Sequence, residues 1–416
     1  MPQIAIRSER LLERFLKYVQ VGTAADPESK NYPSSAGQWT LGKILVEELK
    51  AMSAEDVHHD ENGLVWATIP ATLPGPLPTI LLNAHLDTSP EAPGENVKPQ
   101  VIEHYSGGDI ALRAGNQITV SGCPALESLT GHCLVTTDGT TLLGGDDKAG
   151  VAVIMELAQH LIEYPSIPHG PLRILFTCDE EIGKGTQCVD IAKTGAVAGY
   201  TLDGSGHGEV ENENFSADQL VVRAVGHNIH PSIGKGRMVN ALRGLATLVS
   251  ELPFHSRSPE STEGRDGFLH PYHFAGGVGE AELRILLRDF DTARLDDYAD
   301  LVAKVAADVE KKLPGLKFEL QRSRQYRNMA DALKRHPMVV RLAQQAFEQL
   351  GQKSSLGSIR GGTDGAMLSE MGLPTPNLSV GQHNIHSVLE FVSLNEMTLA
   401  LEHAVELLKL WSEQRT

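Results

Sequence analysis

Short apolar runs rich in β-branched residues alternate with amphipathic stretches along the first two hundred residues of the chain. Apolar runs of this length predict strands, and apolar residues recurring every three or four positions predict helices. The predicted strands are 64–69, 79–83, 172–177 and 200–202, and the predicted helices are 11–19, 40–52 and 147–163. Alternating strands and helices favour an α/β fold whose sheet is parallel over a substantial part.

The pattern changes between about residues 215 and 327 and then changes back. The middle segment predicts strands at 220–225 and 282–287 and helices at 238–251 and 292–313. After residue 335 a helix at 338–350, a strand at 376–379 and a closing helix at 394–413 restore the earlier alternation. We therefore expect a catalytic domain made of 1–214 and 328–416, a mixed sheet flanked by helices. It is interrupted at 215–327 by a smaller α+β lid domain.

The composition of the chain limits the classes of molecule that it is expected to bind. The 416 residues include 36 Lys plus Arg and 53 Asp plus Glu, a net charge of −17, which argues against binding to nucleic acid or to an anionic membrane. The N-terminus lacks the apolar core of a signal peptide, and no window approaches the roughly 20 apolar residues of a membrane span. We expect a soluble, cytoplasmic protein whose four cysteines are reduced thiols.

Three consecutive carboxylates follow the apolar strand at 172–177. Asp179, Glu180 and Glu181 cannot be left unpaired where a buried strand emerges, so a divalent metal is the natural partner. Successive residues of an extended chain point in opposite directions, so Glu180 and Glu181 should have different tasks. A Glu that does not bind the metal can take a proton from an activated water and pass it to a leaving amine. The alternative is a solvated acidic turn.

Five further candidate residues lie where other strands end or helices begin, or in a polar loop. His85 and Asp87 follow one strand, and Asp87 can orient the imidazole through its second nitrogen. Asp146 lies between glycines at a helix start, where it could instead be a simple cap. Asp203 ends another strand and His386 lies in a polar loop; alone, each would more often be structural. Ligands gather at the carboxyl ends of strands in open α/β sheets, so these residues should converge.

Taken together, the clusters supply donors for two metal ions about 3.5–4 Å apart, with one carboxylate bridging and one Glu left as a base. Other catalytic motifs are missing from the sequence: a phosphate-binding loop, a Gly-x-Ser-x-Gly elbow, His-Glu-x-x-His and a dinucleotide-binding glycine fingerprint.

These motifs resemble those of the co-catalytic dizinc metallopeptidases, which include aminoacylase-, carboxypeptidase- and dipeptidase-type enzymes. The resemblance covers nearly the whole chain. Segments 82–88, 145–150, 179–183 and 202–204 are similar to the whole group, whereas 137–144, 261–268, 288–291 and 359–366 are similar to its tripeptide aminopeptidases. The resemblance implies a tripeptide aminopeptidase that releases the N-terminal residue of a small peptide.

The same resemblance implies roles for individual residues. Asp146 would bridge two Zn²⁺ ions per subunit, with Co²⁺ or Mn²⁺ as substitutes. His85 and Asp203 would hold one ion, Glu181 and His386 the other, and Glu180 would be the general base.

In the lid, the resemblance implies that His230 stabilises the reacting carbonyl and that Asn240 and Arg288 face the substrate. Arg360, whose planar fork suits a carboxylate, would bind the far end of the peptide. Ordinary loop and helix-start hydrogen bonding is the alternative for His230, Asn240 and Arg360. The family resemblance also suggests a homodimer formed through the lid domain.

Two positions depart from the family pattern. Gly145 stands where the family commonly has Ala, which we expect only to loosen the turn. The last loop holds two histidines, His383 and His386, and the spacing to the following 390–392 favours His386.

Two other classes of function are open from the sequence. One is a related dizinc dipeptidase, carboxypeptidase or N-acyl amino acid deacylase. The other is a non-catalytic metal- or peptide-binding protein, for which Glu180 would have no purpose.

Overall fold

The chain folds into two compact units. A computed structural model describes residues 6–414. Unit 1 comprises the chain up to Asn212, Met329–Ser358 and the residues from Thr363 onward, and unit 2 comprises Glu213–Asn328 and Ile359–Gly362. The breaks lie close to those expected at 214 and 328, but the short segment Ile359–Gly362, assigned from the sequence to the catalytic domain, belongs to unit 2.

Unit 1 is built on a large mixed sheet, to which eleven strands contribute within residues 6–414. Nine strands follow the order β1-β2-β8-β3-β9-β16-β17-β7-β4, and β10 pairs with β15 and β16. The three inner pairings β8–β3, β3–β9 and β9–β16 are parallel, and the outer pairings are antiparallel. The strands are β1 (Glu55–His59), β2 (Val65–Ile69), β3 (Ile80–His85), β4 (Gln100–Ile102), β7 (Leu134–Thr136), β8 (Leu172–Thr177), β9 (Ala198–Ser205), β10 (Glu209–Asn214), β15 (Ser355–Ile359), β16 (Asn377–His383) and β17 (Phe391–Ser393).

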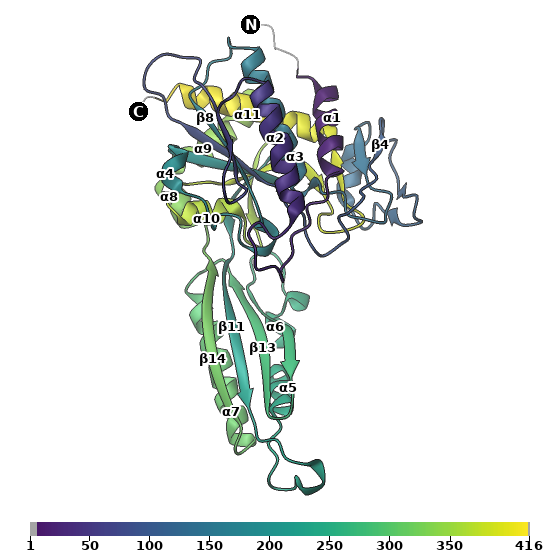
Figure 1. The fold of residues 1–416 in the computed structure, drawn as a ribbon, viewed down its shortest axis with the longest axis vertical. Coiled ribbons are helices and arrows are strands. Elements are labelled where there is room, and N and C mark those ends of the chain that lie inside the picture. Colours follow the sequence, from purple (N-terminus) through teal and green to yellow (C-terminus); the bar gives the residue numbers. More distant parts are fainter. Residues whose placement is uncertain (1–5, 415–416) are drawn as a thin grey trace. The chain divides into compact units, whose positions relative to one another are not determined.

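Helices flank this sheet (Figure 1). They are α1 (Ser8–Val19), α2 (Ala36–Ala51), α3 (Gly145–Glu163), α4 (Ile191–Thr194), α8 (Ala330–Arg335), α9 (Pro337–Gln349), α10 (Asp364–Glu370) and α11 (Leu394–Ser412). Nearly every residue of α3 is buried, because this helix packs on β3, β9 and β16 and is itself covered by α1 and α11. By contrast α1 is amphipathic and buries a stripe of apolar side chains that includes Leu11 and Phe15. A small outlying part carries the hairpin β5 (Ile110–Ala111) and β6 (Gln117–Ile118).

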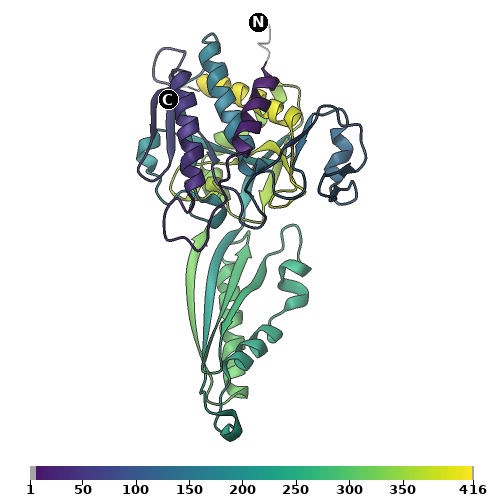
Figure 2. The ribbon, with the colours of Figure 1, turned by 45° about the vertical axis from the view of Figure 1, so that its right-hand side comes forward.

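Unit 2 is a four-stranded antiparallel sheet in the order β12-β13-β11-β14, with helices on one face (Figure 2). Its elements are β11 (Ser216–Val225), α5 (Ala241–Glu251), α6 (Phe254–Arg257), β12 (Phe268–Gly276), β13 (Glu280–Asp289), α7 (Arg294–Lys312) and β14 (Lys317–Tyr326). Alternate residues of β11 and β13, such as Val222 and Ile285, point into one core with Leu245 of α5 and Val302 of α7. Unit 2 therefore has its own hydrophobic core.

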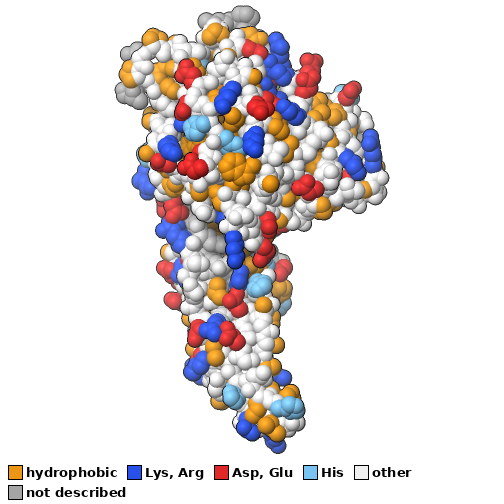
Figure 3. All heavy atoms as spheres, viewed as in Figure 1, with side chains coloured by type: hydrophobic (Ala, Val, Ile, Leu, Met, Phe, Trp, Pro, Cys, Tyr) orange, Lys and Arg blue, Asp and Glu red, His pale blue; other side chains and the backbone are white. Residues whose placement is uncertain are grey.

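The predicted α/β class, with an inserted α+β unit, is confirmed. Each strand and helix predicted above has a counterpart, usually with shifted ends. The prediction missed short or exposed strands, among them β1, β4, β7, β12 and β14. No helix within residues 6–414 is long and apolar enough to cross a membrane. Acidic and basic side chains are interspersed on the face shown in Figure 3.

Candidate metal centre

Parallel pairing brings three of the predicted segments to one edge of the sheet. β3 lies between β8 and β9 and is parallel to both, with His85 opposite Thr177 in the register. His85 ends β3, the carboxylates at 179–181 follow β8, and Asp203 lies near the end of β9. The convergence expected at the carboxyl ends of the strands is what the structure shows.

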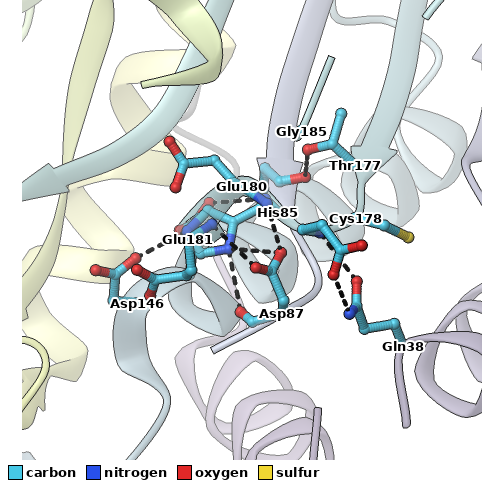
Figure 4. Close-up of polar contacts among 12 residues, drawn as sticks. Gln38, His85, Asp87, Asp146, Thr177, Cys178, Glu180, Glu181 and Gly185 are labelled. Carbon is cyan, nitrogen blue, oxygen red and sulfur yellow. Dashed lines mark hydrogen bonds and ion pairs between the residues drawn. The ribbon is translucent and has the colours of Figure 1, made fainter. Parts of the chain in front are cut away.

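Asp146 lies beside His85 and Glu181 (Figure 4), and its carboxylate also reaches His386. Its Oδ1 is 2.9 Å from Nε2 of His85, and its Oδ2 is 3.2 Å from Nε2 of His386. Nε2 of His386 is also 2.9 Å from Oε2 of Glu181, and Nε2 of His85 is 3.7 Å from Oδ1 of Asp203. All five predicted ligands thus form one continuous cluster, with the two oxygens of Asp146 facing different histidines.

The alternative role of Asp146 as a helix cap does not describe this geometry. The cap position of α3 is taken by Gly144, which has φ +80°, and no side chain caps the helix there. Asp146 and Asp147 have non-helical backbone angles at the start of α3, so the Asp146 side chain is directed toward the histidines.

Both histidines direct Nε2 toward the cluster because Nδ1 of each ring lies next to an oxygen atom outside the cluster. Nδ1 of His85 is 3.1 Å from the backbone oxygen of Asp87 and 3.5 Å from its carboxylate. Nδ1 of His386 is 3.2 Å from Oε2 of Glu91. An acceptor on the second ring nitrogen is the usual support of a metal-binding histidine.

The Asp87 side chain does more than the sequence suggested. Its two carboxylate oxygens accept hydrogen bonds, each 3.0 Å long, from the backbone N–H groups of Glu180 and Glu181. Asp87 therefore couples the end of β3, with its histidine, to the turn that carries both glutamates.

The electrostatics of the cluster fit a cation. Oε1 of Glu181 is buried and has no hydrogen-bond partner among residues 6–414. Burial, and then the charge of Asp146, raises the pKa of Glu181 to about 7 and that of Asp203 well above its ordinary value. Burial opposes the charged form of His386, but hydrogen bonds to Asp146 and Glu181 raise its pKa to about 11. The cluster has more carboxylates than histidines, and both histidines face the carboxylate of Asp146. Carboxylate oxygens and imidazole nitrogens are donors that divalent metals take in proteins.

The geometry of Glu180 and Glu181 corrects one sequence argument. The expectation of alternating side chains assumed an extended chain, but Glu180–Ile182 is a single 3₁₀ turn that follows Asp179 in a left-handed conformation, φ +61°. The turn, closed at Gly183 with φ +71°, separates the two side chains instead. In Figure 4 the Glu180 carboxylate points away from that of Glu181. Burial raises the pKa of Glu180 well above its ordinary value.

Asp179 has a structural role. Its carboxylate accepts hydrogen bonds from the backbone N–H and hydroxyl of Ser34 and from the Gln38 side chain. It therefore ties the turn to the start of α2 and lies outside the ligand cluster.

The two departures from the family pattern have physical explanations. His383 is not part of the cluster, because its Nε2 is 2.7 Å from Oε2 of Glu396 and its ring stacks on Phe391. Gly145 lies in tight packing, since a Cβ there would lie 2.6 Å from Cγ1 of Val392. The turn is thus closely packed, in contrast to the looser turn that we expected.

Asp147 lies against the cluster and was not among the residues predicted from the sequence. With His85 and Asp203 it forms a second group whose potential ligand atoms lie within 4.8 Å of one another. Its oxygens accept hydrogen bonds from the backbone N–H groups of His85 and Gly150. The signal in the sequence was the adjacent pair Asp146-Asp147, which we interpreted through its first member alone.

The four predicted lid and substrate residues belong to unit 2. Arg360 lies over the rings of Phe215 and Phe268, at 5.2 and 5.6 Å from their centroids. It donates hydrogen bonds to Gly264 O and to Thr262 O and Oγ1. The guanidinium of Arg288 lies 6.0 Å from the ring centroid of Tyr326.

Asn240 and His230 make the local hydrogen bonds that were the alternative to a substrate role. Asn240 caps α5 by accepting from the backbone N–H of Arg243. His230 is exposed, and its Nδ1 is 2.7 Å from Oγ of Ser232. Contact of these side chains with substrate stays a prediction.

Comparisons with known proteins show which proteins this chain is similar to. Residues 136–410 match the family model described as peptidase family M20/M25/M40. Peptidase T of Geobacillus thermodenitrificans is 44% identical over 410 residues, which cover 98% of this chain and 99% of that protein. Aminopeptidase PepT from Bacillus cereus superposes with a TM-score of 0.75 at 24% identity, covering 98% of this chain and all of that one. A tripeptidase from Staphylococcus aureus superposes with a TM-score of 0.74 at 25% identity and the same coverage.

Proposed function

The chain belongs to the peptidase family M20/M25/M40, and we propose that it is a dizinc aminopeptidase that releases the N-terminal residue from tripeptides. The resemblance seen in the sequence motifs is confirmed by this membership. A peptide hydrolase is the function common to the family and to the matched relatives. The identity of the metal and the roles of single residues are the parts that we propose.

The observation that carries the two-metal proposal is the division of the Asp146 carboxylate between two histidines. One oxygen is 2.9 Å from His85 and the other is 3.2 Å from His386. Asp146 could therefore be shared between two metal ions of a two-metal hydrolytic site. His85 and Asp203 would complete one site, and His386 and Glu181 the other.

Zinc suits this mixed set of nitrogen and oxygen donors, and Co²⁺ or Mn²⁺ could replace it. Metal bound by these residues would supply Lewis-acid activation of the scissile carbonyl and of a water molecule. The chain's own residues must then move the protons and hold the peptide.

Glu180 is the residue that we assign to proton transfer. It lies beside the ligand Glu181 in the sequence, yet its carboxylate points away from that of Glu181 and is not a member of either potential metal group. It would take a proton from the attacking water and deliver it to the leaving amine. Asp87 would keep Glu180 in place, through the hydrogen bond to its backbone N–H.

Recognition of the peptide is assigned to unit 2. Arg360 would bind the C-terminal carboxylate and so measure the length of the substrate, while Asn240 and Arg288 would hold its backbone. His230 would stabilise the negative charge that develops on the carbonyl oxygen. The matched tripeptidase from Staphylococcus aureus supports a substrate of this length.

We also propose a homodimer formed through unit 2. The edge strand β12 exposes Tyr272 and Phe274, which are 42% and 49% accessible, on a strand with an unpaired side. Sedimentation of the purified protein would show a dimer that Phe274→Arg weakens, and a wild-type monomer would refute the proposal. Cytoplasmic location and the lack of nucleic-acid or membrane partners stay predictions from composition.

Kinetics on peptides of graded length test the function. We expect high kcat/KM for tripeptides, and much lower values for dipeptides, tetrapeptides and acetylated amino acids. Chelation should abolish turnover and zinc should restore it. Preference for dipeptides or acetylated amino acids would instead identify a dipeptidase or deacylase. A metal-loaded protein without turnover on any of these substrates would indicate a binding protein.

A further inference from the structure

A buried carboxylate outside the predicted ligand set holds the loop that carries Asp146. Glu390, which is 1% accessible, lies just before β17. Its Oε2 accepts hydrogen bonds from the backbone N–H groups of Leu143 and Gly144, at 2.7 and 2.8 Å, and its Oε1 accepts one from Asp146, at 3.0 Å. Burial raises the pKa of Glu390 to about 7, and the three hydrogen bonds from backbone N–H groups favour its charged form.

Two of the donors, Leu143 and Gly144, immediately precede α3, and the third, Asp146, lies in its first turn. This turn has no side-chain cap, so Glu390 supplies the acceptors for N–H groups at the helix start. It also fixes the peptide unit of Asp146 itself, which sets the direction of the Asp146 side chain. Glu390 and Val392 pack tightly against the backbone of Gly145, since a Cβ at Gly145 would lie 3.1 Å from Oε1 of Glu390 and 2.6 Å from Val392.

The hairpin that contains Glu390 also supports two other ligands. Gln382, on β16, donates a hydrogen bond from Nε2 to the backbone oxygen of Asp203 at 2.8 Å and contacts its Oδ1 at 3.2 Å. Gln382 pairs with Val392 across the β16–β17 ladder, and His386 lies in the connection between these strands. One short segment, 382–390, therefore contains the proposed ligand His386 and also makes hydrogen bonds to Asp203 and to the backbone of Asp146.

We propose that Glu390 is a positioning residue that orients Asp146 to bridge the two metal sites. The inference rests on the proposed dizinc function. No hydrogen bond described within residues 6–414 joins Glu390 to the side chain of a proposed metal ligand. Its effect on Asp146 therefore passes through the backbone of 143–146. A carboxylate is required because both oxygens must accept, whereas the amide of Gln has one acceptor and one donor.

The test is Glu390→Gln, which keeps the shape of the side chain and places an NH₂ group against backbone N–H donors. The matched control is Glu396→Gln, the same change at a buried Glu whose partner is His383. Metal affinity would be measured by competition with a chelating zinc indicator, and ligand geometry by the visible absorption spectrum of the Co²⁺-loaded proteins.

We expect Glu390→Gln to bind at least one metal about 10–100-fold more weakly than wild type and to change the Co²⁺ spectrum. Glu396→Gln should retain both properties. A Glu390→Gln protein with wild-type affinity and spectrum would overturn the inference, even if its melting temperature fell. Wild-type protein that fails to bind two metals would refute the dizinc proposal instead, so the two failures are distinguishable.

Glu390→Asp is a second variant that tests the inference if Glu390→Gln does not fold. It keeps the charge and both acceptors but is one methylene too short to reach the turn, so metal affinity should again fall. Wild-type affinity in this variant would contradict the inference. If neither variant folds, Glu390 acts in folding and the positioning role is overturned.

Discussion

Arg360 should distinguish a free peptide carboxylate from its amide, and the structure allows the size of this effect to be worked out. The perturbation is Arg360→Gln, which removes the charge and the fork but keeps a polar side chain. The wild-type protein and the variant would each be tested on one tripeptide and on its C-terminal amide.

The magnitude follows from the hydrogen bonds that Arg360 already makes. A guanidinium has five N–H donors, and the contacts of Arg360 with Gly264 O, Thr262 O and Thr262 Oγ1 use at most three. Two donors are left for a carboxylate, each worth about 1.5–3 kcal/mol when charge-assisted. Because Arg360 is only half-buried, we take the lower end, about 3 kcal/mol in total, which is about 100-fold in kcat/KM.

The assay compares ratios, so that a general loss of activity cancels. Wild type should prefer the free tripeptide over its amide by about 100-fold, and Arg360→Gln should treat the two alike. The matched control is Arg265→Gln, because Arg265 also lies over an aromatic ring, 4.6 Å from the centroid of Phe290. Equal losses on both substrates in Arg360→Gln would refute the reasoning and assign Arg360 to packing on Phe215 and Phe268.

Three further predictions concern the metal centre and stability. Glu180→Gln should keep two metals by elemental analysis but lose about 10²–10⁴-fold in kcat; near-normal turnover would remove Glu180 from the base role. Asp146→Ala should lose metal from both sites, and full zinc occupancy by elemental analysis would contradict bridging. Burial lowers the pKa of His403 from 6.5 to about 4, so its stabilising contribution is present above pH 6.5 and lost as pH falls toward 4. The difference in unfolding free energy between wild type and His403→Phe, from urea titrations, should therefore shrink between pH 7 and pH 5; a constant difference would contradict this sign.

The ligand cluster could be predicted because most of its residues belong to short local sequence motifs. His85, Asp146, Glu181 and Asp203 each follow or begin an element with a strong apolar pattern, so their place in the fold followed from the elements. The choice of His386 over His383 was harder, because both lie in one polar loop. In the structure His383 pairs with Glu396, a residue thirteen positions away that no local pattern indicates as its partner.

The missing parts depend on contacts that are distant in sequence. Glu390 meets the turn at 143–146 across a separation of 244–247 residues, so no spacing rule could indicate the pair. Strands such as β12 and β14 have mostly exposed residues and lack the apolar runs by which the buried strands were found. The 3₁₀ turn at Glu180–Ile182 depends on a left-handed Asp179, a conformation that propensity does not favour.

The strand order of unit 1 has a consequence for how the protein is made. β16 and β17, from residues 377–393, lie between β9 and β7, which were synthesised long before them. Until these strands emerge from the ribosome, β7 and β4 have no place in the sheet and β9 has a bare edge. His386 and Glu390 arrive at the same late moment. A nascent chain should therefore be unable to hydrolyse peptides until residue 393 has left the ribosome, and a stalled product should be a target for chaperones rather than a working enzyme.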